Sequence, residues 1–186
     1  MKLRLMKRTA DRKSEAKKLR REEQVPAVIY VKDQASEAVA VNGAEFSAAL
    51  RSIQPGRLAT TRFTLVDESG KERPAIVKEI QYDPTSYRIL HLDFEELFND
   101  RKVNVKVPIE CVGVADCIGV KLGGILRQVV RNILVSCLPK DIPSVFQVDV
   151  KNMGQMEAKR LGDIEIPQTV RPIANLQEVA VVIAKR

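Results

Sequence analysis

The sequence predicts a mainly β protein, in which a small N-terminal β-barrel with one or two short helices is followed by a second β-rich domain. Short runs rich in β-branched residues recur along the chain, several with period-two alternation, and turn-forming residues separate them. The 186 residues, 45% of them hydrophobic, suffice for one large or two small domains with buried cores. Because aromatic residues make up only 4% of the chain and Trp is absent, we expect cores of Val, Ile, Leu and Ala.

The first unit is expected to combine strands with short helices. Residues 1–8 alternate enough to form an edge strand, residues 9–13 are typical of a loop, and residues 14–23 favour a short helix. The strand-like runs that follow span residues 25–31, 37–41, 60–66, 73–82 and 87–94. Five such runs and one longer helix within about 95 residues favour a small barrel or a strongly coiled sheet over a parallel α/β fold.

The longer helix of this unit has a recognisable start and stop. Asn42 followed by Glu45 resembles a capping box with Asn as the cap, and the Pro55–Gly56 pair ends the element. Apolar residues recur between them at helical spacing, namely Phe46, Ala49, Leu50 and Ile53. We therefore expect the apolar stripe of this helix to lie on the sheet.

A second unit follows the polar segment 99–101. We place the domain boundary between Glu96 and Leu97, so that the first domain spans residues 1–96 and the second spans residues 97–186. Residues 103–110 alternate between apolar and mostly polar residues, which is the pattern of a strand with one dry face. Further β-rich runs cover residues 125–138, 145–150 and 178–184, and prolines stand in several of the connections.

Most of the net charge lies in the first 24 residues. This segment has ten Lys or Arg residues and four acidic residues, which gives +6 of the total of +7. A short segment that repels itself is tolerated when an anionic partner neutralises it, and a polyphosphate backbone is the commonest such partner. The alternative is a solvated basic tail without a partner.

The expected helix at residues 14–23 places its cations together. Lys17, Arg20 and Arg21 share one face at i, i+3 and i+4, whereas Ala16 and Leu19 form only a thin apolar stripe. Such a helix gains most of its order from contact with phosphates, so we expect it to be mobile alone and ordered in a complex.

A polar pair stands out in the strand-like run at residues 87–94. Alternation there directs Ile89, His91 and Asp93 to one face, and it directs Leu90, Leu92 and Phe94 to the buried face. A carboxylate two residues from an imidazole can orient it, and both groups can bind base edges or ribose hydroxyls. Gln81 ends the preceding strand, so a hairpin through residues 83–86 brings its amide close. The alternative is an exposed polar pair without a task.

Other classes of function find less support. No apolar stretch is long enough to span a bilayer, and the first ten residues lack the apolar run of a secretory signal, so we expect a cytoplasmic protein. Cys111, Cys117 and Cys137 are odd in number and lack metal-ligand spacing, and they are typical of reduced core thiols. Neither an oxyanion pattern nor a ligand pattern accompanies His91 and Asp93, so we expect no enzyme, no metal and no cofactor.

Several segments together resemble a known family. The segment KSEAKKLRREEQVPAVIY, Gln81 and the block HLDFEEL are similar to the 5S ribosomal RNA-binding protein family of the bacterial large ribosomal subunit, the twenty-fifth in the usual numbering. IECVGVADCIGVKLGGILRQV and CLPKDIP resemble the extra domain of the long form, which is also called Ctc or general stress protein. The resemblance covers essentially the whole chain, and the order PAVIY, HLDF and GVKLGG is its specific feature.

The resemblance implies a non-catalytic β-barrel that binds the minor groove of the loop E region of 5S ribosomal RNA. It implies phosphate contacts for the basic segment, at Arg12, Lys17, Lys18, Arg20 and Arg21. It implies contacts from the sheet face at Tyr30, Gln81, His91 and Asp93. The family usually has glycine in the basic loop and after the tyrosine of PAVIY, whereas this chain has Ser14, Glu15 and Val31 in those stretches, which leaves the register of individual phosphate contacts open.

For the second domain the resemblance implies a β-rich module that contacts neighbouring ribosomal proteins or RNA. Its segment 119–124 contains three glycines but lacks the ending of a phosphate-binding loop, so a turn between strands is the better interpretation. The main alternative for the whole chain is a protein-interaction or stress-response module only loosely associated with ribosomes, but that alternative gives no reason for the charge of the N-terminal segment.

Overall fold

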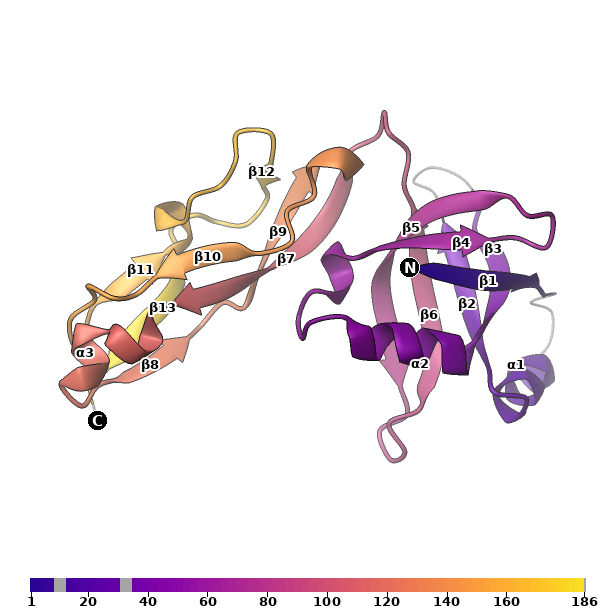
Figure 1. Ribbon diagram of the computed structural model, residues 1–186, viewed down its shortest axis with the longest axis horizontal. Helices are drawn as coiled ribbons and strands as arrows, with labels where there is room; N and C mark the ends of the chain where they lie inside the picture. The colour runs from indigo at the N-terminus through magenta and orange to yellow at the C-terminus, as the bar shows by residue number, and fades with distance from the viewer. Residues whose placement is uncertain (9–12, 31–34, 186) are drawn as a thin grey trace. The chain divides into compact units, whose positions relative to one another are not determined.

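The chain folds into two compact units, Met1–Arg101 and Lys102–Arg186, in a computed structural model that describes residues 1–8, 13–30 and 35–185 (Figure 1). Strands dominate both units, and short helices stand between strands within each unit, so the mainly β fold class is confirmed. Each unit has its own sheets and its own buried apolar residues, as an independent core requires. No helix among the described residues is long and apolar enough to cross a membrane.

The first unit is a closed six-stranded barrel with the strand order β1-β3-β2-β6-β5-β4. Its strands are β1 (Lys2–Lys7), β2 (Gln24–Tyr30), β3 (Glu37–Asn42), β4 (Arg62–Val66), β5 (Glu72–Tyr82) and β6 (Ile89–Glu96). Its helical elements are α1 (Lys13–Arg21), α2 (Gly43–Ser52) and the 3-10 turn η1 (Leu58–Thr60). The predicted small barrel is therefore confirmed, together with both of its helices.

Strand β1 closes the barrel. It pairs antiparallel with β3, where Leu5 lies opposite Val41, and parallel with β4, where Leu3 lies opposite Leu65. The strand predicted within residues 1–8 is confirmed, but its predicted position at a sheet edge is wrong. Leu3 and Leu5 are buried in the barrel, and closure leaves the strand with a neighbour on each side.

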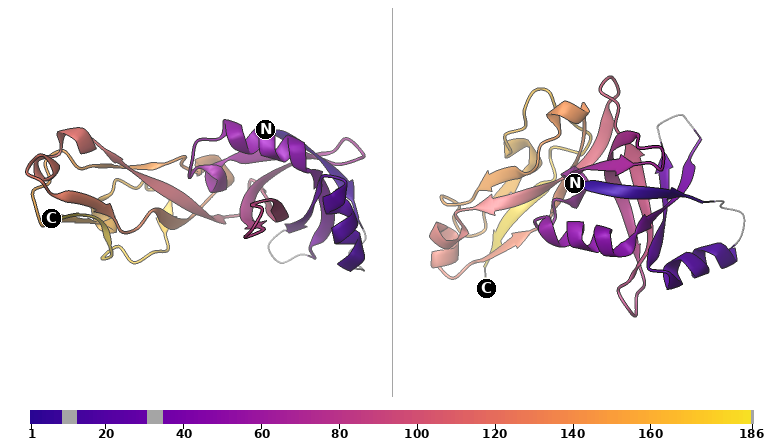
Figure 2. Two further views of the ribbon diagram at one scale, coloured as in Figure 1. Left: turned by 90° about the horizontal axis from the view of Figure 1, so that it is seen from below. Right: turned by 45° about the vertical axis from the view of Figure 1, so that its right-hand side comes forward.

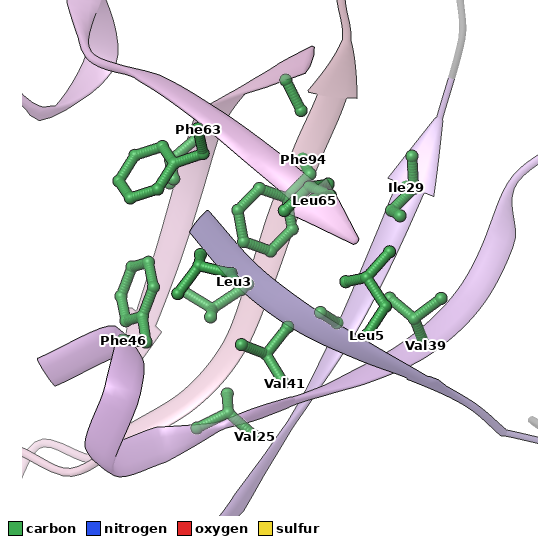
Figure 3. Close-up of a cluster of buried hydrophobic side chains, with 14 residues drawn as sticks. Leu3, Leu5, Val25, Ile29, Val39, Val41, Phe46, Phe63, Leu65 and Phe94 are labelled. Carbon is green, nitrogen blue, oxygen red and sulfur yellow. The ribbon is translucent and has the colours of Figure 1, made fainter. Parts of the chain in front are cut away.

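The barrel core is apolar and includes three fully buried phenylalanines. Phe46 of α2 points toward Phe63 of β4 and Phe94 of β6, and the ring centroids lie 6.0 to 6.4 Å apart (Figure 3). The Asn42 side chain caps α2 and accepts hydrogen bonds from the backbone N–H groups of Ala44 and Glu45, at 2.9 and 3.1 Å. The Asn42 cap is confirmed. The burial of Phe46 confirms that the apolar side of the helix packs on the sheet.

An ion cluster lies at the start of β5. Arg73 contacts Glu37 and Glu96 at 2.6 Å each and Asp67 at 3.6 Å, and its side chain is only 13% exposed. The carboxylates therefore neutralise the charge of Arg73. The ion pairs with Glu37 and Glu96 also join β5 to β3 and β6.

The second unit contains two small sheets, one of four strands in the order β10-β7-β9-β12 and one of three strands in the order β11-β13-β8. The strands are β7 (Val103–Val112), β8 (Ile125–Gln128), β9 (Asn132–Cys137), β10 (Phe146–Asp149), β11 (Ala158–Arg160), β12 (Arg171–Pro172) and β13 (Val179–Ala184). The helical elements are α3 (Ile118–Lys121) and the 3-10 turns η2 (Val114–Asp116), η3 (Pro139–Asp141) and η4 (Leu161–Asp163). The dry face predicted for residues 103–110 is confirmed, because Val103, Val105, Val107 and Ile109 are buried.

The β-rich run predicted at residues 125–138 is confirmed, and it forms two strands, β8 and β9, which join different sheets. Another prediction for this unit needs correction. The segment 119–124 is not a simple turn between strands, because α3 begins at Ile118 and Gly123 follows with a φ of 89°. A Cβ on Gly124 would lie 2.7 Å from the Gly119 carbonyl oxygen, so the glycines permit close packing of backbone.

The three cysteines, all among the described residues, form no disulfide. Cys117 and Cys137 are buried, whereas Cys111 is only half-buried and so lies at the margin of the core. Burial raises the pKa of the Cys111 thiol.

Candidate nucleic-acid interface

A polar surface covers the outer side of three adjacent strands, β2, β6 and β5. Gln81 lies directly opposite His91, and Asp93 lies between Glu79 of β5 and Val28 of β2. Tyr30 lies opposite Glu95. Leu92 and Phe94, which alternate with the polar residues of β6, are fully buried in the barrel. We call this surface, formed by Tyr30, Glu79, Gln81, His91, Asp93 and Glu95, the polar sheet face.

His91 and Asp93 form a hydrogen-bonded pair on this face. The His91 Nδ1 lies 2.6 Å from the Asp93 Oδ1, and the two side chains are 21% and 32% exposed. Because a carboxylate only accepts hydrogen bonds, the Nδ1 atom carries the proton. In the neutral form of the ring the Nε2 atom is an acceptor, and the Asp93 carboxylate offers further acceptor lone pairs to a ligand.

Tyr30 remains protonated at neutral pH. Burial raises the pKa of its phenol to about 12, and the nearby carboxylates of Glu95, Asp93 and Glu79 act in the same direction. The phenol is therefore a neutral group that can donate a hydrogen bond, within a field made negative by three carboxylates.

The charge of the polar sheet face limits what it can bind. Its carboxylates repel phosphate, although Lys78 offsets part of this charge through an ion pair with Glu95 at 2.6 Å. Acceptor groups match hydrogen-bond donors, and an RNA minor groove displays two kinds of donor, the 2′-hydroxyl and the guanine amino group. The face is therefore suited to sugar and base edges, and phosphates require cations from elsewhere.

Helix α1 supplies such cations beside β2 (Figure 2). The side chains of Lys17, Lys18, Arg20 and Arg21 are all exposed. The Arg20 guanidinium donates two hydrogen bonds to the Leu90 carbonyl oxygen, from Nε at 3.1 Å and from Nη2 at 2.9 Å. Leu90 directly precedes His91, so α1 is attached to the strand that carries the His91–Asp93 pair.

The structure thus brings most of the predicted residues together, in two groups. Tyr30, Gln81, His91 and Asp93 share the polar sheet face, and the helix carries Lys17, Lys18, Arg20 and Arg21. Arg12 lies outside the described residues. Ile89 was expected on the outer face, but it packs against the core, because the pairing register shifts between Gln81 and Tyr82.

Sequence reasoning missed two residues of this face. Glu79 precedes Gln81 by two positions on the same strand, so the period of two in β5 could have identified it. Glu95 follows Asp93 in the same way, but a glutamate at 7% exposure is an exception that alternation does not reveal. The bond between Arg20 and Leu90 joins positions 70 residues apart, and no local pattern predicts it.

The turn between β5 and β6 is well defined. The Asp83 carboxylate accepts hydrogen bonds from the Thr85 backbone N–H at 2.8 Å, the Thr85 hydroxyl at 2.6 Å and the Ser86 N–H at 3.1 Å. These bonds lower the pKa of Asp83 to about 2, with the Thr85 hydroxyl as the largest cause. The hairpin therefore holds Gln81 and His91 opposite each other.

Fold and surface together define a class of protein: a small closed β-barrel that carries a cationic helix beside a polar sheet face and is followed by a second β unit. Residues 3–94 match the model of the Ribosomal L25p family, and residues 102–186 match the model described as Ribosomal protein TL5, C-terminal domain. The chain belongs to the ribosomal L25p family, in its long form with the second domain.

Relatives of similar length support this assignment. The chain is 46% identical to the large ribosomal subunit protein bL25 of Chlamydia abortus and of Chlamydia trachomatis serovar L2, over 186 residues and the whole of each protein. It is 41% identical to the protein of the same description from Chlamydia pneumoniae, again over the full length of both. The resemblance noted in the sequence is therefore confirmed across both units.

Proposed function

We propose that this chain binds 5S ribosomal RNA as a protein of the large ribosomal subunit, in the bacterial cytoplasm, and that it does so without catalysis. The observation that carries the proposal is the attachment of α1 to β6, which joins a cationic helix to an acceptor-rich sheet face. Relatives that match over the full length are described as large ribosomal subunit proteins, which supports the same cellular context.

The two parts of the surface bind different groups of the RNA. The helix, through Lys17, Lys18, Arg20 and Arg21, neutralises phosphates, and Arg12 of the preceding segment adds to this charge. The sheet face, through Tyr30, Gln81, His91 and Asp93, hydrogen-bonds sugars and base edges. Phosphate contacts fix position, and base contacts fix the choice of RNA.

A widened minor groove is the ligand shape that fits this division. The major groove of A-form RNA is too deep and narrow for a sheet, whereas its minor groove is shallow and displays 2′-hydroxyls. The non-standard helix of loop E in 5S ribosomal RNA offers such a groove, as the resemblance to the family implied. The acceptors of His91 and Asp93 would bind its hydroxyl and guanine amino donors.

Hydroxyl-radical footprinting tests this proposal, because the radical attacks riboses from the minor groove. With the full chain added to folded 5S ribosomal RNA, we expect protection of the loop E riboses. Replacement of loop E guanosines by inosines, which lack the amino donor, should weaken binding. Protection confined to other regions, or no protection at saturating protein, would contradict the proposal.

We further propose that the second unit contacts neighbouring ribosomal proteins in the subunit. Its surface carries several exposed apolar side chains, among them Ile118, Leu122, Ile125, Val129 and Met156, which suit a protein partner. A fragment of residues 1–101 should therefore keep its affinity for 5S ribosomal RNA but be lost more readily from large subunits during salt washing. A fragment that folds, as circular dichroism can show, and fails to bind the RNA would contradict this division of roles.

A further inference from the structure

Tyr87 has the largest exposed fraction among the exposed large apolar and aromatic side chains of the described residues. It is 79% exposed, at the end of the hairpin between β5 and β6. The chain has only three tyrosines, and all of them lie on or next to the candidate interface: Tyr30 on the sheet face, and Tyr82 and Tyr87 in this hairpin. Tyr82 is also exposed, at 46%.

The backbone at Tyr87 is unusual. Its φ of 55° lies in the left-handed region, which a bulky aromatic residue rarely adopts. The surrounding turn enforces this conformation, since the Tyr87 N–H donates to the Asp83 carbonyl oxygen at 2.9 Å and the Asp83 carboxylate holds Thr85 and Ser86. Strained residues held by their surroundings often mark functional positions.

The hairpin lies at the end of the barrel where the interface begins. It continues β5 and β6 beyond the Gln81–His91 pair, and the Arg20 contact with Leu90 brings α1 to the same end. Figure 1 and Figure 2 show α1 and this hairpin extending from that end of the barrel. An exposed aromatic ring thus lies at the rim of the surface formed by the cations of α1 and by the polar sheet face.

We propose that Tyr87 is a stacking platform for an unpaired nucleobase of the bound RNA, an inference that rests on the proposed function. Every base has a flat π face, so stacking on tyrosine needs no particular base, and exposed aromatic residues beside cations are typical of contacts with unpaired nucleotides. The rigid turn also reduces the conformational entropy lost on binding. Tyr87 would then add a contact outside the groove to those of the polar sheet face.

Two substitutions separate the ring from the backbone. Tyr87→Phe keeps the aromatic face and should bind 5S ribosomal RNA as the wild type does. Tyr87→Asn removes the ring but tolerates a positive φ, so it should melt at the same or a higher temperature and bind about tenfold more weakly. The dependence of affinity on salt should be unchanged in both, because no charge is altered.

A fluorescence measurement reports stacking directly. The chain lacks Trp, so Tyr87→Trp introduces a single reporter. We expect quenching of its emission on addition of 5S ribosomal RNA, and much less on addition of a fully paired RNA duplex of equal length. Unchanged emission with bound 5S RNA, or a Tyr87→Asn variant that binds as tightly as the wild type, would overturn the stacking role alone. Absence of wild-type binding would overturn the proposed function as well.

Discussion

The Arg20 guanidinium donates two hydrogen bonds, of 3.1 and 2.9 Å, to the carbonyl oxygen of Leu90, which is 70 positions away in the sequence. Helix α1 has little apolar surface of its own, because Ala16 and Leu19 are its only apolar residues. A short helix of this kind is marginal in isolation. The Arg20 contact attaches α1 to the strand of His91, and the mobility expected of this helix without RNA stays a prediction.

The first prediction concerns this attachment. Arg20→Lys keeps the charge but replaces the planar fork with a single ammonium group, which cannot reproduce both hydrogen bonds. We expect faster hydrogen exchange of the α1 amides in the free protein and a loss of about 1 kcal/mol in binding to 5S ribosomal RNA. The salt dependence of binding should not change, since the charge is kept.

Arg21→Lys is the matched control, because it makes the same chemical change one position along the same helix. It should leave hydrogen exchange in α1 as in the wild type. If Arg20→Lys also left exchange unaltered while binding fell, Arg20 would act by contact with RNA and not by holding the helix.

The second prediction concerns the His91–Asp93 pair. Asp93→Ala removes the acceptor that fixes the proton on Nδ1, and His91→Ala removes the ring, so each should weaken binding by roughly 1–3 kcal/mol. Neither side chain lies in the core, so thermal melts should stay close to that of the wild type. A variant that lost its fold, while its remaining folded fraction bound normally, would show that the pair is structural.

The third prediction separates stability from binding. Arg73→Ala leaves the carboxylates of Glu96 and Asp67, which are 11% and 13% exposed, without their cation. We expect a loss of about 3 kcal/mol in the free energy of unfolding, measured with urea. Binding of the folded protein to RNA should persist. Unchanged stability would mean that the cluster is solvated and contributes little.

The fourth prediction concerns the pH dependence of the hairpin. The pKa of Asp83 is lowered to about 2, below the value of about 3.9 expected in an unfolded chain. A lowered pKa means that the ionised form stabilises the turn, so this contribution is complete above about pH 4 and is lost as the pH falls through 2. Carboxyl chemical shifts recorded by NMR between pH 1.5 and 5 would show the titration. A midpoint near 4 would contradict the hydrogen-bonded turn.

The sequence allowed much of the fold to be predicted, because local patterns determine most of its elements. The cap at Asn42, the alternation of residues 103–110 and the inward Leu92 and Phe94 all follow from short-range periodicity and turn chemistry. These signals need no knowledge of distant contacts.

Long-range pairing accounts for what the sequence did not reveal. The parallel contact of β1 with β4 turns an expected edge into a barrel seam, and nothing in residues 1–8 indicates it. The bend after Gln128 sends β8 and β9 to different sheets. At the interface, the shift of register beside Gln81 moves Ile89 inward, and the Arg20–Leu90 bond depends on the packed tertiary structure.

The most direct test of the account is the affinity of the full chain for folded 5S ribosomal RNA measured over a series of salt concentrations. Several phosphates neutralised by the helix and its preceding segment predict a log–log slope on the order of −4 to −7, and Lys17→Ala should reduce its magnitude by about one. An unrelated structured RNA of equal length should bind more weakly at every salt concentration. A flat slope, or equal affinity for both RNAs, would contradict the account.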